Sequence, residues 1–162
     1  MKMKQTLFGL ILLFPAMCLG MEKADFVVVK KSESRLYLMT EGRIIKKFPV
    51  SFGSNPRGHK HRKGDKRTPE GFYFLDYKKE TSAFYKSIHI SYPNETDKLQ
   101  AIQRGVDPGG MIMIHGQPKD HVQLSIDSHK YNWTDGCIAL SNKDMDVVWQ
   151  AVEDGTPIRI LP

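Results

Sequence analysis

Cysteine is nearly absent from this sequence, which contains two cysteines in 162 residues. Cys18 lies in an N-terminal segment with the character of a targeting signal, so removal of that segment leaves Cys137 as the only thiol. A single cysteine forms no intramolecular disulfide and supplies no Cys-x-x-Cys zinc site. The sequence therefore excludes a disulfide-stabilised scaffold and a cysteine-rich zinc domain.

An apolar run of transmembrane length is also missing, because a spanning helix requires about 20 apolar residues. The apolar stretch 7–14 is shorter, and it follows Lys2 and Lys4 at the N-terminus. This pattern predicts a secretory signal peptide over residues 1–20, cleaved at its end. Acylation of Cys18 and retention as an uncleaved anchor are the alternatives. We expect a location in the periplasm or cell envelope, with no stable membrane span after cleavage.

Charge of one sign is not strongly enriched. The chain has 24 basic and 18 acidic residues, and loss of Lys2 and Lys4 with the signal peptide leaves 22 basic residues and a net charge of about +4. This charge is too small to predict a nucleic-acid partner, and it suits an anionic wall polymer, a membrane surface or ordinary solubility. Residues 21–162 contain no repeat or low-complexity tract and have the length of one domain.

The hydrophobic pattern predicts a mostly β domain with one or two peripheral helices. Short β-branched or apolar runs bounded by turn residues predict strands, and Glu41-Gly42 predicts a hairpin turn. The expected strands cover residues 26–29, 36–39, 43–50, 72–75, 86–92, 111–114, 137–140 and 156–161. Helices are expected over residues 95–104 and 141–152, the second with Ser141 as its cap.

Residues 51–71 are rich in glycine, proline and basic side chains, which predicts a long loop. Its basic residues are candidates for holding carboxylates, although a solvated loop is at least as compatible with the composition; they are Arg57, Lys60, Arg62, Lys63, Lys66 and Arg67. His59-x-His61 supplies two possible metal ligands without acidic or cysteine partners at the usual spacing, so we expect no metal site.

Cys137 and His115 form the candidate catalytic pair. An unpaired thiol in an oxidising compartment requires a reason, and a histidine that takes the thiol proton supplies one. The apolar run 111–114 places His115 at the end of a rigid strand, which favours it over the rival bases His121 and His129 in polar sequence. The alternative is that Cys137 is a small buried hydrophobic residue.

The glycines beside this pair have predicted roles. Gly116 lets the chain turn directly after His115, and Gly136 allows close backbone approach beside Cys137. The backbone amides of Gly136 and Cys137 are therefore predicted to stabilise an oxyanion. Trp133, together with Tyr131, is a candidate wall of a substrate groove, and packing under a loop is the equally compatible alternative.

The segment from His115-Gly116 to Thr134-x-Gly136-Cys137-Ile138-x-Leu140-x-Asn142 resembles the signature of the L,D-transpeptidase catalytic domain (YkuD type). The upstream Gly64-Asp65-x-x-Thr68-Pro69-Glu70-Gly71 segment is similar to the same family. The resemblance implies a single YkuD-like β-sandwich domain, a Cys137 nucleophile, a His115 base and peptidoglycan stem peptides as substrate, without a cofactor. The substrate-binding residues that we expect on this basis are Thr134, Asp135, Trp133, Gly116 and Arg67.

Two positions depart from the family pattern. Many members carry His before the Gly-Cys pair and Arg or Asn two places after it, whereas this chain has Asp135 and Ala139. The Trp-Thr-Asp-Gly-Cys-Ile-Ala-Leu version resembles a divergent branch that includes hydrolytic enzymes. We therefore expect acyl transfer between stem peptides and keep hydrolysis as the alternative. The hydrolase would be an L,D-carboxypeptidase or an amidase that cuts a diaminopimelate-linked bond. A wall-linked protein is the additional partner that we consider. A cell-wall-binding module without activity is the remaining alternative.

Overall fold

One sheet of eight strands dominates the computed structural model, which describes residues 21–118 and 131–162. The strands are β1 (Phe26–Lys30), β2 (Arg35–Thr40), β3 (Arg43–Pro49), β4 (Gly71–Thr81), β5 (Tyr85–Ile90), β6 (Met113–His115), β7 (Ile138–Ala139) and β8 (Thr156–Leu161). Two helices, α1 (Glu95–Arg104) and α2 (Asn142–Ala151), complete the domain. The expected mostly β fold with peripheral helices is confirmed.

The sheet has the order β3-β2-β1-β8-β4-β5-β6-β7, with parallel pairing at β1–β8 and β6–β7. Beyond β3, the chain returns to the opposite end of the sheet. Ser51 and Ala139 exchange backbone hydrogen bonds of 3.0 and 2.9 Å, and Thr134 N donates to Phe52 O at 3.1 Å. Both ends of the sheet consequently contribute to one hydrophobic core.

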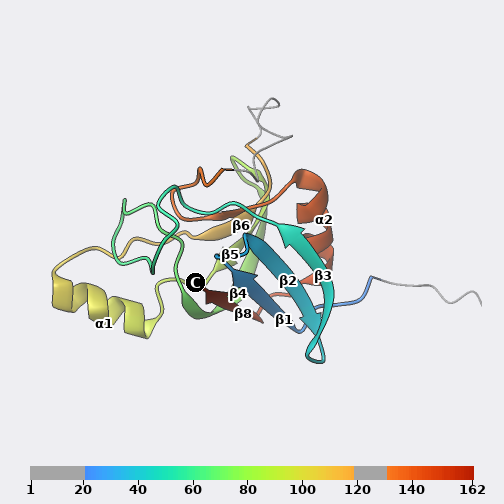
Figure 1. The fold of residues 1–162 in the computed structure, drawn as a ribbon, viewed down its shortest axis with the longest axis horizontal. Helices are drawn as coiled ribbons and strands as arrows, with labels where there is room; N and C mark the ends of the chain where they lie inside the picture. Colours follow the sequence, from blue (N-terminus) through green and yellow to red (C-terminus); the bar gives the residue numbers. More distant parts are fainter. Residues whose placement is uncertain (1–20, 119–130) are drawn as a thin grey trace, which may run out of the picture.

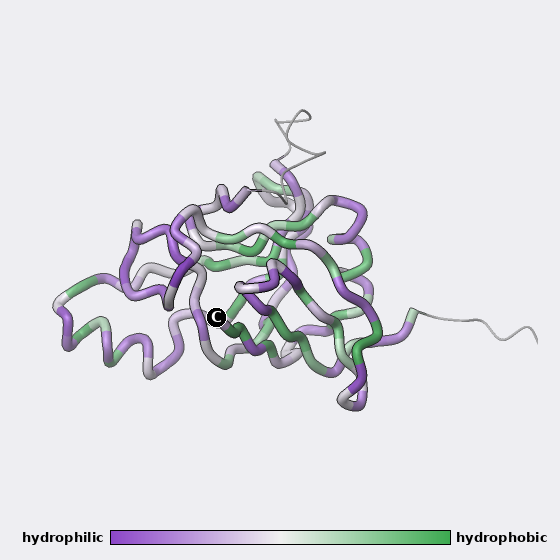
Figure 2. Tube along the Cα trace, in the orientation of Figure 1, coloured by the Kyte–Doolittle hydropathy of each residue, from purple (hydrophilic) through white to green (hydrophobic). Residues whose placement is uncertain are grey.

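Strand alternation produces this core. Tyr73 and Leu75 of β4 are buried, whereas the intervening Phe72 and Phe74 are exposed, as the two-residue period of a strand requires. Figure 2 shows hydrophobic residues along the central strands, while the loops on the left are largely hydrophilic.

The two helices have different relations to the sheet. Helix α2 buries Met145, Val148 and Ala151, and the Ser141 side chain caps it by accepting from Asp144 N at 3.1 Å. Helix α1 extends away from the strands (Figure 1) and begins with a capping box formed by Asn94 and Asp97. Within residues 21–118 and 131–162, no helix is long and apolar enough to cross a membrane.

The structure corrects three predicted boundaries. Met111 was expected in a strand covered on both faces, but it is 61% exposed with a φ of 56°, and β6 begins at Met113. Cys137 precedes β7 and lies outside the strand expected to contain it. Strand β4 continues to Thr81, because its polar second half pairs with β5, which apolar patterning does not reveal.

Candidate active site

Parallel pairing of β6 with β7 brings the two candidate catalytic residues to neighbouring positions. His115 is in register with Ala139, so Cys137 lies two residues earlier on the adjacent chain segment. Regular strand geometry separates such diagonal Cα positions by roughly 8 Å. The two strands are neighbours as expected, but His115 lies inside β6 instead of after it, and Cys137 directly precedes β7.

The Cys137 thiol is half-buried and contacts the backbone at the start of β6 and just before it. Its Sγ accepts a hydrogen bond from Met113 N at 3.4 Å and lies 3.8 Å from Met111 O, to which the S–H donates. Burial raises the pKa of Cys137, and the nearby Asp135 carboxylate adds to this effect, against the opposing Met113 amide and Lys60 ammonium. Cys137 is therefore a neutral thiol at neutral pH.

His115 is a buried, neutral imidazole with a defined tautomer. Its Nδ1 lies 2.6 Å from Gly116 O, and because a carbonyl only accepts, Nδ1 carries the proton and Nε2 is the basic nitrogen. Burial lowers the pKa of His115 to about 4, although the Gly116 carbonyl favours the charged form. The Phe84 ring stacks on the imidazole at 4.0 Å, and the Trp133 ring meets it edge-on at 5.9 Å.

Alkylation should reveal the neutral state of the thiol. In a Cys18→Ser background, the rate of Cys137 modification by iodoacetamide is expected to rise with pH to a midpoint above the ordinary thiol pKa of about 8.5, because burial disfavours the thiolate. Mass spectrometry of samples quenched across pH 6–11 gives the profile. A midpoint below pH 7 would contradict a resting thiol and indicate a preformed thiolate.

A tight turn presents the thiol. The Thr134 hydroxyl donates to Cys137 O at 2.7 Å and accepts from Gly136 N at 3.2 Å. Gly136 has a φ of 134°, and a Cβ there would lie 2.6 Å from Arg67 O. The Gly136 amide is therefore committed to the turn, whereas the Cys137 amide has no hydrogen-bond partner in the described part of the chain.

Gly116 occupies a crowded position behind His115. A Cβ there would lie 2.6 Å from Asn142 Oδ1 and 2.7 Å from Tyr85 O. Asn142 Oδ1 also accepts from Gln117 N at 2.7 Å, which joins the end of β6 to the start of α2. Gly116 thus allows the close packing that holds the His115 backbone.

A cleft of about 640 Å³ is lined by residues adjacent to Cys137, although Cys137 itself does not line it. Its lining includes Met111, whose carbonyl contacts Sγ, and Asp135, which directly precedes the Gly136-Cys137 pair. Charged residues of both signs line this space; they are Lys60, Lys63, Asp107 and Asp135. Arg67 lines a separate hollow and approaches the turn through its backbone carbonyl. The volume is in the range of small-ligand sites.

Comparison of the sequence and fold with known proteins identifies the family of this chain. The family model of the L,D-transpeptidase catalytic domain (YkuD) matches residues 24–160. The chain belongs to this family. The Escherichia coli (strain K12) protein YafK, whose name assigns it to the L,D-transpeptidases, is 30% identical over 112 residues, which cover 68% of this chain and 38% of YafK.

Two solved structures share the fold. The helical cell shape determining protein Pgp2 from Campylobacter jejuni aligns with a TM-score of 0.64 at 30% identity, covering 83% of this chain and 46% of Pgp2. The L,D-transpeptidase from Mycobacterium smegmatis aligns with a TM-score of 0.57 at 16% identity, covering 85% and 58%, respectively. The chain spans less than half the length of YafK and of Pgp2.

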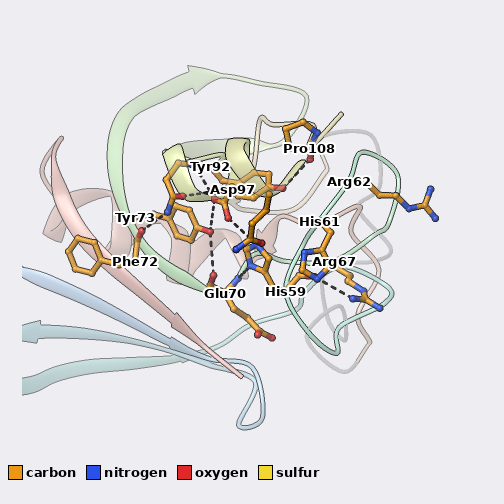
Figure 3. A network of polar contacts seen from close by, with 12 residues as sticks. His59, His61, Arg62, Arg67, Glu70, Phe72, Tyr73, Tyr92, Asp97 and Pro108 are labelled. Atoms are coloured by element: carbon orange, nitrogen blue, oxygen red, sulfur yellow. Dashed lines mark hydrogen bonds and ion pairs between the residues drawn. The ribbon is translucent and has the colours of Figure 1, made fainter. Parts of the chain in front are cut away.

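The basic loop of this L,D-transpeptidase domain is tied to α1 and β4 by a polar network (Figure 3). His59 Nδ1 accepts from Glu70 N at 2.9 Å, and His59 Nε2 lies 3.0 Å from Asp97 Oδ1. The Tyr73 hydroxyl donates to Asp97 Oδ2 at 2.9 Å. Both His59 nitrogens are engaged, and among the described residues no three His, Cys, Asp or Glu side chains gather as metal ligands.

The sequence-predicted site residues therefore fall into three groups. His115, Trp133, Thr134, Gly136 and Cys137 lie together where β6 pairs with β7, and Asp135 lines the cleft. Gly116 allows close packing behind His115, and the Arg67 backbone packs against the turn at Gly136. The rival bases His121 and His129 lie outside the described residues. Sequence reasoning missed Phe84, because no spacing rule connects the end of the β4–β5 hairpin with His115.

Proposed function

We propose that this protein catalyses cysteine-dependent acyl transfer on peptidoglycan stem peptides. Membership of the L,D-transpeptidase family connects the chain to peptidoglycan. The observation that carries the proposal is the His115 tautomer, because Gly116 O fixes the proton on Nδ1 and leaves Nε2 as a base on the strand beside Cys137.

The first half of the reaction forms a thioester. As Cys137 Sγ attacks the carbonyl carbon of the scissile amide, the thiol proton passes to His115 Nε2, so no free thiolate is required beforehand. The Cys137 amide stabilises the oxyanion of the tetrahedral intermediate, a contribution of about 3 kcal/mol for one well-placed donor. The C–N bond then breaks, and His115 returns its proton to the leaving amine.

The second half releases the acyl group. An incoming amine attacks the thioester while His115 takes its proton, and the S–C bond breaks with return of that proton to Cys137. The product is a cross-linked or amino-acid-exchanged stem peptide. Water as the acceptor gives hydrolysis by the same steps. Neither half requires a metal or an organic cofactor.

Hydrolysis is the second candidate outcome, supported by the residues around the thiol. Ala139 is buried between its partners Ser51 and His115, so no charged or amide side chain extends from that position. Asp135 instead contributes an exposed carboxylate to the cleft. An L,D-carboxypeptidase or an amidase acting on a diaminopimelate-linked bond, including a bond to a wall-linked protein, fits this arrangement.

We further propose the setting of this activity. Residues 1–20 act as a signal peptide, and residues 21–162 form the catalytic domain in the periplasm or cell envelope. A cell-wall-binding module without activity remains the alternative from another class. In that role Cys137 would need no base on the neighbouring strand, whereas the fixed tautomer of His115 on β6 favours an enzyme.

Mass spectrometry of muropeptides tests this function. The full chain and its Cys137→Ala variant are incubated with free muropeptides and with muropeptides that carry a linked peptide or protein. Cross-linked or exchanged products that the variant fails to make would establish transfer, and Cys137-dependent shortening or release alone would establish hydrolysis. Binding without any Cys137-dependent product would overturn the enzyme proposal in favour of the binding module.

A further inference from the structure

The basic loop borders a second hollow, which has a volume of about 470 Å³. Three cations of the loop line this hollow; they are Arg62, Lys66 and Arg67. Among the described residues that line it, only Gly64 also lines the cleft of the candidate active site. The second hollow is therefore a separate space, and the proposed acyl transfer gives its cations no role.

The cations of this hollow have little compensation in the described part of the chain. The Arg62 and Lys66 side chains are exposed and form no hydrogen bond or ion pair there. Figure 3 shows the Arg62 guanidinium pointing away from the His59–Asp97 network. Arg67 Nη1 donates to His59 O at 3.4 Å, but no described carboxylate pairs with Arg67, and its Nε is buried without a described partner. A half-buried guanidinium in this state is stabilised by an anion beside it.

The carboxylate that lines the hollow is already fully engaged. Asp65 accepts from Lys60 Nζ at 2.9 Å and from the backbone amides of His61, Arg62 and Arg67. Burial opposes ionisation, but these donors outweigh it and lower the pKa of Asp65 to about 2. The charge of Asp65 is balanced by Lys60, which does not line the hollow. The same hydrogen bonds hold the loop in one conformation, which reduces the entropy lost when a ligand binds.

The His61 imidazole is affected by the excess of positive charge. His61 Nδ1 accepts from Arg104 Nη1 at 2.9 Å, so Nε2 carries the proton of the neutral ring. Burial lowers the pKa of His61, and the cations Arg104 and Arg67 add to this effect. Asp65 opposes the shift with the smallest of these contributions. The charges around the hollow are therefore predominantly positive.

We propose that this hollow is a binding site for a phosphate monoester group. Such a group carries a charge of about −2 and three terminal oxygens, enough to pair with Arg62, Lys66 and Arg67 together. A carboxylate offers one charge and two oxygens. Arginine also matches the bidentate geometry of phosphate oxygens. The group belongs to a soluble ester or to a phospholipid headgroup, which present the same chemistry. This site is independent of the proposed function.

Calorimetric titration of the full chain at constant ionic strength tests the site. Methyl phosphate is the probe, and dimethyl phosphate, a monoanion, and acetate are the comparison anions. The natural protein is expected to bind methyl phosphate with saturation and at least about 10-fold more tightly than either comparison anion, the effect of one hydrogen bond to a charged group. The Arg62→Gln/Lys66→Gln double variant is expected to bind methyl phosphate about 10- to 100-fold more weakly. Both positions are exposed, so its Tm is expected to be unchanged.

Lys46→Gln/Lys47→Gln is the matched control. Both lysines are exposed on β3 and do not line the hollow, so this variant loses the same net charge outside the site. It is expected to change the affinity for methyl phosphate by less than about 2-fold, because salt screens charges that do not contact the ligand. A similar loss of affinity in both double variants would show that net charge alone attracts phosphate, and would overturn the proposal.

Vesicle sedimentation distinguishes the two sources of the phosphate group. The natural protein and both double variants are mixed with phosphatidylcholine vesicles with and without phosphatidic acid. Binding that requires phosphatidic acid and is lost only in Arg62→Gln/Lys66→Gln would identify a lipid headgroup, and saturable binding of methyl phosphate alone would identify a soluble ester. Absence of saturable binding in both assays, or equal affinity for acetate or dimethyl phosphate, would overturn the site. Because neither assay requires turnover, that result would leave the proposed function standing.

Discussion

Replacement of His115 by glutamine is expected to lower kcat/KM by about 10²- to 10⁴-fold, the contribution of a positioned general base. The buried Cys137 thiol has a raised pKa, so it depends on His115 Nε2 to accept its proton during attack. Glutamine retains a polar side chain but has no basic nitrogen. Steady-state kinetics measures the loss, with a stem peptide that the natural protein converts and Cys137→Ala does not.

The pH profile distinguishes a lost base from a disturbed fold. His115 must be neutral to act, and its pKa of about 4 predicts that kcat/KM of the natural protein falls only as the pH approaches 4. In His115→Gln, the residual activity is expected to lack this acidic limb. An acidic limb near pH 6.5 in the natural protein, the ordinary histidine value, would show that the imidazole is solvated during catalysis.

The same residue links stability to pH. The folded pKa of His115 lies below the unfolded value, so the unfolded chain binds more protons between pH 4 and pH 6.5. The stability from the neutral imidazole is complete above pH 6.5 and is lost as the pH falls toward 4, by roughly 3 kcal/mol. His115→Gln is expected to lack this component, which urea unfolding across the same pH range measures. Kinetic data in this window therefore require circular dichroism to verify folding.

Gly136→Ala is expected to destabilise the domain by about 2–5 kcal/mol, from backbone strain and overpacking together, and to abolish turnover. The new Cβ would lie 2.6 Å from Arg67 O and 3.2 Å from Ile112 Cδ1, and the φ of 134° is unfavourable for alanine. Relief of these contacts must move the Thr134–Cys137 turn or the Arg67 backbone. Urea unfolding and the Cys137-dependent assay measure the two effects.

Gly42→Ala separates strain from crowding. Gly42 also has a positive φ, 74°, but a Cβ there meets nothing within 4 Å. Its substitution is expected to cost only about 1 kcal/mol and to leave activity unchanged. Equal losses of stability in the two variants would mean that the Arg67 segment yields without cost, and the turn would then not be fixed by packing.

Local patterns in the sequence were sufficient for most of the scaffold. The β-branched runs before Pro49 and the capped segments at Asn94 and Ser141 specify strands and helices through contacts within a few residues. The pairing of β6 with β7 was also predictable, because one short apolar run directly precedes His115 and another directly follows Cys137.

The charge state of the site was not predictable in the same way. The sequence predicted a histidine that takes the thiol proton, but the pKa of Cys137 depends on how deeply the turn is buried between segments distant in sequence. The same applies to Lys60, which composition placed among six equivalent basic residues of a loop. Its pairing with Asp65 is local to the loop, whereas its burial accompanies contacts of that loop with distant segments, such as the hydrogen bond from Lys63 N to Asp107 O.

The bridge between Ser51 and Ala139 restricts how a peptide can bind. Strand β7 pairs with β6 on one side and with the segment after β3 on the other, so it has no open edge beside the thiol. A substrate therefore cannot dock by adding a strand to β7, the common mode of extended-peptide recognition. For the proposed substrates, we expect recognition to rely on side-chain groups that reach the cleft, and to change more with substrate chemistry than with peptide length.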